Sequence, residues 1–370
     1  MNTLPQLPNI TEASSRMHQT LSQLEPSIVR VLGQNPGRYT LQGTNTYLIK
    51  HPATSAAILL DAGQGIEGYT TLLRPLLTPQ TRLTIILSHW HEDHVNGLPD
   101  VLDLVRELGC PPPSVWKFAA TEPDKDAHIE SLISDDHAVA RPQLGLGLLA
   151  TTPGKIHKLQ EGQMFGLSDD SLQGFVASGP TLEVVHAPGH TSDSVALVFH
   201  PRGPTESDAP ALFTFDTVLG HGTAVFEDLG AYMSSLTKCI AKLESAGVAP
   251  PTAPSMVKLY PGHGEVVLDG VTKMKEYITH RQQRENEVVD SLRTASEPTT
   301  ATALCEKIYG DTIPDALKLA ATRGLILHLE KLERERKVLR YEVSDKGHEV
   351  IPGWGDGWTL LTGTEDQPKM

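Results

Sequence analysis

Six consecutive residues, His89-Trp90-His91-Glu92-Asp93-His94, contain five potential metal ligands and come shortly after the apolar run Leu83–Leu87. A short apolar run predicts a buried strand, and side chains alternate along a strand. His89 and His91 would therefore project to the same side of the strand end and share one metal ion. Asp93 and His94 follow where the chain turns, within reach of a second ion. A histidine-rich turn in solvent is the alternative, and the residues downstream argue against it.

Three later segments with strand-like patterns also lead into a residue that can bind metal. The three are His190 after Ala187-Pro188-Gly189, Asp216 after the run Ala211–Phe215, and His263 within Pro261-Gly262-His263-Gly264. Glycine lets the backbone turn sharply and lets an imidazole approach an ion closely. One ion would then be held by His89, His91 and His190. A second would be held by Asp93, His94 and His263, with Asp216 bridging the two.

The chemistry of this ligand set points to hydrolysis. Imidazoles and carboxylates favour Zn²⁺, here two ions per chain, and Mn or Fe are also compatible with these ligands. Two ions roughly 3.5–4 Å apart lower the pKa of a shared water and stabilise developing negative charge. Asp93 is the candidate catalytic residue, because its carboxylate can take the water proton or pass it to the leaving group. A hydroxide formed at this dinuclear site would cleave an ester, thioester, amide or phosphodiester.

The elements that must position these residues alternate between strands and helices. Strands are predicted at 46–49, 57–60, 83–87, 181–186, 195–199, 211–215 and 257–260. Helices are predicted at 69–77, 98–108 and 229–246; the second has a proline in its first turn and a glycine after its end. Alternation of this kind predicts an α/β fold with a layered core.

A chain of 370 residues is long enough for one large and one small domain. We expect residues 1–27 to be disordered and 28–272 to form the large domain. Residues 122–179 are predicted to be an insertion without regular elements. In 273–370, helices are predicted at 273–293, 301–309, 314–320 and 324–337, with a strand over 338–343. This order predicts a small helical, winged-helix-like domain, a type that binds nucleic acid in some proteins and caps an active site in others.

Composition excludes several other functions. The net charge of −14 disfavours non-specific attraction to nucleic acid or to an anionic membrane. Cys110, Cys239 and Cys305 lie far apart, which favours a reducing compartment over a disulfide framework. No apolar run is long enough to span a bilayer, and the N-terminal stretch lacks the pattern of a signal peptide or mitochondrial presequence. We therefore expect a cytoplasmic protein without a membrane partner. The sequence is also compatible with a homodimer.

The segment His89–His94 is similar to the HxHxDH motif of the metallo-β-lactamase superfamily, and His190, Asp216 and His263 match the later ligands. The resemblance covers roughly Ile28–Gly264 and implies an αββα four-layer sandwich with the metals at one edge. Three further stretches, Arg30–Gly37, Leu41–Tyr47 and Leu219–Leu229, resemble the lactamase-β-2-like group. That group includes an endoribonuclease of single-stranded RNA. It also includes fungal thioesterases that release polyketides from an acyl carrier protein, and both carry a C-terminal helical domain.

Two residues depart from the pattern of this group. The group usually has Gly before the bridging Asp, where this chain has Phe215, and GHTxDH, where this chain has Ser194 in place of the last His. Asp61 ends a predicted strand, where it could orient a ligand or simply cap the strand. Asn45 and Tyr47 could shape the pocket, although packing is the better-supported interpretation.

Several functions follow from these patterns. We favour a metal-dependent thioesterase that releases a polyketide from an acyl carrier protein in secondary metabolism. The alternatives are an endoribonuclease, with RNA as partner, and a non-catalytic protein with a degenerate metal site. A glyoxalase-type thioesterase is a weaker option. The endoribonuclease needs a basic track, and the sequence contains no strong Lys/Arg run.

Overall fold

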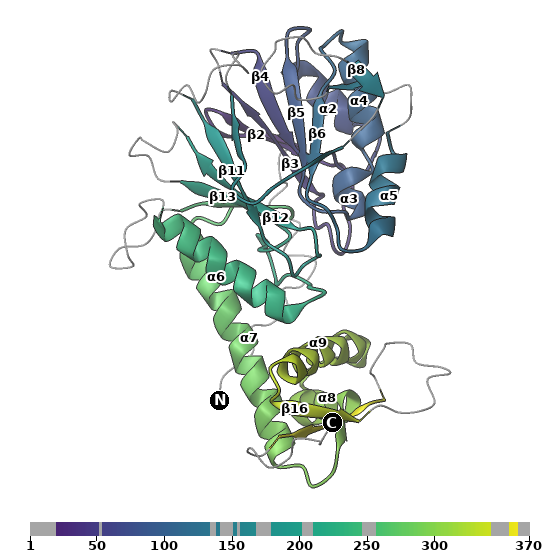
Figure 1. Cartoon of the computed structure of the whole chain (residues 1–370), viewed down its shortest axis with the longest axis vertical. Coiled ribbons are helices and arrows are strands. Elements are labelled where there is room, and N and C mark those ends of the chain that lie inside the picture. Colours follow the sequence, from purple (N-terminus) through teal and green to yellow (C-terminus); the bar gives the residue numbers. More distant parts are fainter. Residues whose placement is uncertain are drawn as a thin grey trace.

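The computed structural model describes residues 20–51, 54–133, 138–140, 151–153, 156–167, 179–201, 210–245, 257–341 and 355–361. Its larger part contains two mixed sheets that pack face to face (Figure 1). The first sheet runs in the order β1 (Leu21–Glu25), β2 (Ile28–Leu32), β3 (Asn45–Lys50), β4 (Ala56–Leu60), β5 (Arg82–Leu87), β6 (Ser114–Lys117) and β9 (His157–Lys158). Pairing is antiparallel from β1 to β4 and parallel from β4 to β9.

The second sheet has the order β10 (Met164–Gly166), β11 (Thr181–His186), β12 (Val195–His200), β13 (Ala211–Phe215) and β14 (Leu259–Pro261). Its strands are antiparallel except for β13 and β14, which run parallel. Because β13 and β14 point the same way, Asp216 and His263 leave the sheet at the same edge. Strands β7 (Ala138–Ala140) and β8 (Thr151–Pro153) form a separate two-stranded antiparallel sheet, in which β7 lies near β6.

Three apolar cores alternate with these two sheets. The middle core joins side chains of both sheets, such as Tyr47 and Ile86 from the first and Leu197 and Phe213 from the second. The outer face of the first sheet is covered by α2 (Tyr69–Leu73), η1 (Arg74–Leu76), α4 (Leu98–Glu107) and α5 (Pro123–Ser131). The outer face of the second is covered by α6 (Leu229–Ser245) and the start of α7 (Gly270–Arg293). The predicted αββα sandwich is therefore confirmed.

Helix α7 continues out of the sandwich into a smaller unit around its second half (Figure 1). The other elements there are β15 (Thr299–Thr300), α8 (Ala301–Tyr309), η2 (Gly310–Thr312), α9 (Asp315–Arg334), β16 (Val338–Tyr341) and β17 (Gly357–Leu360). The strands form a sheet in the order β15-β17-β16, and Trp358 is fully buried against α7, α8 and α9. The winged-helix-like architecture is as predicted, whereas the domain boundary at 272 stays a prediction, because α7 crosses it without a break.

Three expectations about elements were wrong. Strand β1 lies within residues 1–27, which were expected to be disordered; it is ordered by its pairing with β2. Residues 1–19 lie outside the described residues. Helix α5 and strands β7 to β10 lie within 122–179, where no element was expected. The two helices predicted at 314–320 and 324–337 are one helix, α9, because burial of Leu325 and its neighbours outweighs the cost of about 1 kcal/mol for Gly324.

Among the residues that the structure describes, no helix is both long and apolar enough to cross a membrane. The cytoplasmic location and the oligomeric state stay predictions.

Candidate metal centre

The seven residues predicted as metal ligands converge where strands of the two sheets end. His89 and His91 follow β5, and Asp93 and His94 lie on the short helix α3 (Glu92–Val95). His190 lies in the turn between β11 and β12, Asp216 follows β13, and His263 follows β14. Their ligand atoms form two groups, within each of which all atoms lie within 4.8 Å of one another. The first contains His89, His91, His190 and Asp216, and the second contains Asp93, His94 and His263.

Within the first group, three imidazole nitrogens face one another. His91 Nδ1 lies 2.9 Å from His89 Nε2 and 3.0 Å from His190 Nε2. Nitrogen ligands lie about 2.0–2.1 Å from zinc, so neighbouring ligands of a tetrahedral ion are roughly 3.3 Å apart. The three nitrogens are therefore close to the spacing that one ion requires.

Asp93 and Asp216 connect the second group to the first. Asp93 Oδ2 lies 3.2 Å from His94 Nε2 and 3.3 Å from His263 Nε2. Asp216 Oδ2 lies 3.5 Å from His190 Nε2 and 3.3 Å from His263 Nε2. Asp216 therefore stands between the two groups, where the sequence placed the bridging ligand.

The outer nitrogens of three imidazoles have partners that fix how the rings face the site. His190 Nδ1 lies 2.7 Å from the carbonyl oxygen of Val225, which can only accept a hydrogen bond. His94 Nδ1 lies 2.7 Å from Asp61 Oδ2. Ser88 donates its hydroxyl to the same carboxylate and lies 2.9 Å from His89 Nδ1. In each ring Nδ1 therefore carries a proton, and Nε2 is directed at the other ligands. Asp61 orients two rings rather than simply ending a strand.

The charges of the site divide the histidines into two kinds. Burial, together with the neighbouring imidazoles, lowers the pKa of His91 to about 4 and that of His89 well below its usual value. Burial alone would also lower the pKa of His263, but the carboxylates of Asp216 and Asp93 raise it to about 9. The same balance, with Asp93, Asp216 and Asp61, holds the pKa of His94 well above its usual value.

These residues fit a divalent metal. Among the described residues, His94 Nε2 and Asp216 Oδ1 are buried polar atoms without a hydrogen-bond partner, and both point at the site. A Cβ on Gly262 would come within 2.2 Å of Asp216 Oδ1, so only glycine leaves room for the carboxylate at this turn. The nitrogen and oxygen donors are those that Zn²⁺ prefers, with Mn and Fe compatible. That these residues bind metal stays a prediction.

Two residues that sequence reasoning missed support Asp93. The hydroxyl of Thr44 donates to Asp93 Oδ2 at 2.8 Å. The amide of Asn35 donates to the Thr44 hydroxyl at 3.0 Å, so the hydroxyl proton is directed at the carboxylate. Thr44 was noted only as part of a group-specific stretch, and no local pattern links it to a residue 49 positions later.

Asn45 and Tyr47 are buried, and both hold the turn that carries His263. Asn45 Nδ2 donates to the carbonyl oxygens of Pro261 and Gly264 at 3.0 and 2.9 Å, and the Tyr47 hydroxyl donates to that of Pro261 at 2.6 Å. This agrees with the packing interpretation of both residues.

The two departures from the group's pattern have local explanations. Phe215 has a φ of +46°, a conformation that glycine adopts easily and other residues rarely do. Its ring is buried in the middle core, which offsets a backbone strain of about 1–3 kcal/mol. Ser194 Oγ lies 2.6 Å from the hydroxyl of Thr191 and accepts from its backbone N–H at 3.2 Å, so it closes the His190 turn instead of supplying an imidazole.

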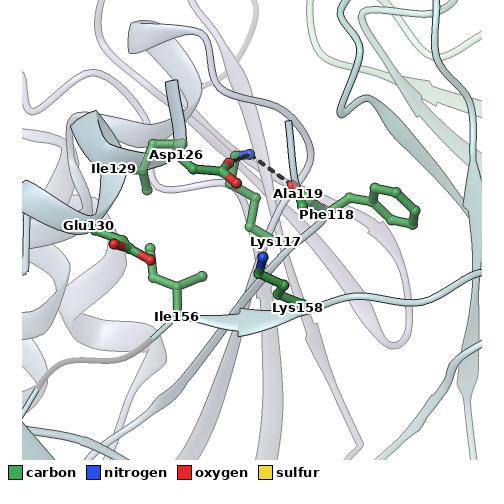
Figure 2. A pocket seen from close by; sticks show the side chains of 8 residues that line it. All are labelled: Lys117, Phe118, Ala119, Asp126, Ile129, Glu130, Ile156 and Lys158. Atoms are coloured by element: carbon green, nitrogen blue, oxygen red, sulfur yellow. Dashed lines mark hydrogen bonds and ion pairs between the residues drawn. The ribbon is translucent and has the colours of Figure 1, made fainter. Parts of the chain in front are cut away.

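A small pocket lies at the end of β6 (Figure 2). Ile129 and Ile156 contribute apolar side chains to its lining. Lys117, one of its lining residues, contacts Asp126 Oδ1 at 2.8 Å and the buried Asp193 of the His190 turn at 2.6 Å. The pocket contains none of the seven candidate ligands, so its link to the metal centre is through the backbone that carries His190.

Comparison with known proteins agrees with this geometry. Residues 39–263 match the family described as "Metallo-beta-lactamase superfamily". The chain belongs to this superfamily. Residues 300–346 match the family "Beta-lactamase associated winged helix domain". The chain therefore resembles those members of the superfamily that also carry this winged-helix domain.

Two relatives and one solved structure illustrate the similarity. A beta-lactamase-like protein 2 homolog from Drosophila melanogaster is 33% identical over 324 residues, covering 86% of this chain and 91% of that protein. An atrochrysone carboxyl ACP thioesterase from Cryptosporiopsis sp. is 29% identical over 336 residues, covering 86% of this chain and 84% of that protein. The crystal structure of a beta-lactamase domain protein from Burkholderia ambifaria superimposes with a TM-score of 0.61 at 17% identity, covering 92% and 93% of the two chains. The structural similarity supports the fold alone.

Proposed function

We propose that this protein is a metal-dependent hydrolase with two ions per chain, zinc being the preferred metal. The observation that carries the proposal is the pair of adjacent ligand groups with Asp216 between them. His89, His91 and His190 would hold one ion, Asp93, His94 and His263 the other, and Asp216 would bridge. When bound, such ions activate water and polarise the bond to be cleaved.

The chain's own residues position and move the proton. The Thr44 hydroxyl and the rings of His94 and His263 all approach Asp93 Oδ2, so this oxygen is fixed and Oδ1 remains for the reacting water. Asp93 takes a proton from the water as its oxygen bonds to the acyl carbon. The bond to the leaving group then breaks, and Asp93 returns the proton to that group.

We favour a carrier-bound acyl thioester as the substrate. Support comes from the fungal relatives named as atrochrysone carboxyl ACP thioesterases, which cover most of this chain at about 30% identity. The net charge of −14 also disfavours a polyanionic substrate. A role in polyketide release and secondary metabolism is part of this proposal.

RNA is the competing substrate, because the winged-helix unit belongs to an architecture that binds nucleic acid in some proteins. Several cations on α9 are paired with acidic side chains, however. Lys331 contacts Glu285, Arg334 contacts Asp228, and Lys318 contacts Glu306. Such pairs leave less positive charge for a phosphate backbone.

A direct test compares both substrates with the same zinc-loaded protein. Thioester cleavage is followed with a thiol-reactive dye; Cys110, Cys239 and Cys305 are all buried, so the dye reports the released carrier thiol. We expect hydrolysis of an acyl-carrier thioester, loss of activity in Asp93→Asn, and no cleavage of single-stranded RNA. Cleavage of RNA alone, abolished by the same substitution, would overturn the choice of substrate. A wild-type protein that retains no divalent metal would overturn the hydrolase proposal itself.

A further inference from the structure

The segment Leu219–Asp228, which we call the bridging loop, contacts the candidate metal centre on one side. The carbonyl oxygen of Val225 accepts the hydrogen bond from His190 Nδ1 at 2.7 Å. The backbone N–H groups of Glu227 and Asp228 donate to the carbonyl oxygen of Gly189 at 2.7 and 3.1 Å. The loop therefore holds both the ring of His190 and the backbone immediately before it.

On its other side the bridging loop is held by α7. The Tyr277 hydroxyl donates to the carbonyl oxygen of Gly222 at 3.0 Å. Arg281 Nη2 donates to the carbonyl oxygen of Ala224 at 3.1 Å, and the guanidinium lies over the ring of Phe226 at 4.7 Å from its centre. Arg281 thus contacts the residues immediately before and after Val225.

Helix α9 adds a contact at the end of the bridging loop. Arg334 binds both carboxylate oxygens of Asp228, one of them at 2.9 Å. Its side chain is largely exposed to solvent, so this pair contributes no more than about 1 kcal/mol. Leu327 of α9 also packs in the same apolar core as Phe226 and Leu229. Figure 1 shows how α7 extends from beneath α6 to α9, so the two helices reach the loop from the C-terminal unit.

The exposure pattern of the loop explains why these contacts matter. The side chain of Val225 is 67% exposed, whereas Ala224 and Phe226 on either side are 2% and 7% exposed. Val225 therefore does not anchor its own carbonyl group by packing. The direction of that carbonyl is set by its two neighbours, and Arg281 contacts both of them.

We propose that Arg281, with Tyr277, is a positioning residue for the metal ligand His190, acting from the C-terminal helices through the bridging loop. This rests on the proposed metal-dependent function. The C-terminal unit would then be required for full metal affinity, in addition to any contact that it makes with a substrate. Hydrogen-bond partners of metal-binding histidines typically influence metal affinity by about 10–100-fold.

The test measures metal affinity without any substrate. Wild type, Arg281→Met and Arg284→Met are titrated with Zn²⁺ in competition with a chromogenic chelator, and the absorption spectrum of the Co²⁺ form reports ligand geometry. Arg284 is the matched control, because it lies on the same helix and its side chain contacts Tyr309 and Glu287 in the C-terminal unit. We expect about tenfold weaker binding and an altered Co²⁺ spectrum for Arg281→Met, and wild-type behaviour for Arg284→Met.

Two further variants guard against simple misfolding. Arg281→Lys keeps a cationic donor and should recover part of the lost affinity. Tyr277→Phe removes only the hydroxyl that binds Gly222, and a few-fold loss of affinity is expected with an unchanged melting temperature. If Arg281→Met does not fold, the Tyr277→Phe result decides.

The outcomes separate this inference from the proposed function. Wild-type affinity and spectrum in both Arg281→Met and Tyr277→Phe, with metal bound in wild type, would overturn the positioning role alone. An equal loss of affinity in Arg284→Met would also overturn it, because a general weakening of the C-terminal unit would then suffice. Absence of metal binding in wild type would overturn the proposed function first.

Discussion

Buried histidines occur both at the metal centre and in the C-terminal unit, and the charge states of His263 and His328 are opposite. At the metal centre, the neighbouring carboxylates raise the pKa of His263 to about 9 despite burial. In α9, burial lowers the pKa of His328 to about 3, and the cations Arg281, Arg284 and Lys331 act in the same direction. His280 is a further titratable neighbour of His328.

The difference shows that burial alone does not determine what a histidine does. Asp93, Asp216 and Asp61 give the metal centre a negative charge that attracts protons or, in their place, divalent ions. Burial keeps the ring of His328 neutral and its cationic neighbours act in the same direction, so His328 serves as a packed core residue. Four predictions test this contrast.

The strongest test removes the bridging carboxylate with Asp216→Asn. The two ligand groups lose their shared oxygen, and the pKa of His263 should fall because its first electrostatic partner is gone. We expect metal affinity to fall by more than about 100-fold, beyond the effect of removing a hydrogen-bond partner of a ligand. Metal content after dialysis, measured by mass spectrometry, checks this. Asp103→Asn, an exposed acid paired with Arg106 on α4, should retain wild-type content; equal content in both variants would contradict the bridging role.

Metal binding should depend steeply on pH. Below about pH 9 the ring of His263 carries a proton in the metal-free protein, and that proton must leave before the nitrogen can bind an ion. Affinity should therefore rise by at least about tenfold per pH unit between pH 7 and 9, because the raised pKa of His94 adds a second proton that must leave. Chelator competition across a pH series measures it. A flat profile in this range would contradict the raised pKa of His263.

Acid should destabilise the C-terminal unit through His328. The unfolded chain binds a proton near pH 6.5, whereas the folded protein does so only near pH 3, so stability is lost as the pH falls below 6.5. The loss is about 1.4 kcal/mol per pH unit, or about 2 kcal/mol at pH 5. Hydrogen exchange of α9 at pH 7 and 5 measures it. His328→Leu should lose this dependence and the exposed His221→Ala should keep it; an unchanged dependence in His328→Leu would exclude His328 as its source.

The smallest effect is expected at Thr44, whose hydroxyl contacts one of the carboxylates that give the metal centre its negative charge. Thr44→Val removes the hydroxyl that donates to Asp93 Oδ2 while keeping the side-chain volume. A hydrogen bond to a charged group contributes about 1.5 kcal/mol or more, so we expect about a tenfold lower hydrolysis rate. Steady-state kinetics provide the measurement, and Thr44→Ser, which keeps a hydroxyl, should be close to wild type. Equal rates in the Val and Ser variants would show that the Thr44 hydroxyl does not contribute to hydrolysis.

The seven candidate ligands could be predicted from the sequence because each stands next to a recognisable strand end. His89 to His94 are also contiguous, and Asp216 and His263 follow short apolar runs that predict the strands carrying them. The layered sandwich followed from the same alternation of strands and helices. These are local signals, and the superfamily match agrees with them.

The contacts that support the ligands could not be predicted, because they join residues far apart in sequence. Thr44 meets Asp93 across 49 positions, and Arg281 meets Ala224 across 57. The continuity of α9 was missed for a related reason, since a core formed by α7, α8 and β17 decides it rather than the residues around Gly324. Strand β17 was not predicted; it forms a sheet with β15 and β16.

The hydrogen bonds of Asn45 have a consequence for how the protein assembles. Asn45 begins the third strand of the first sheet, yet its amide holds the turn of His263 more than 200 residues later. Neither sheet can complete the ligand set before the two have docked, and contacts of such sequence separation form slowly. Metal retention during refolding should therefore appear only with the final docking step, after the strands of each sheet have paired. An ion bound by residues of both sheets would then slow the separation of the sheets. The rate of metal loss would therefore report the rate at which the folded chain unfolds.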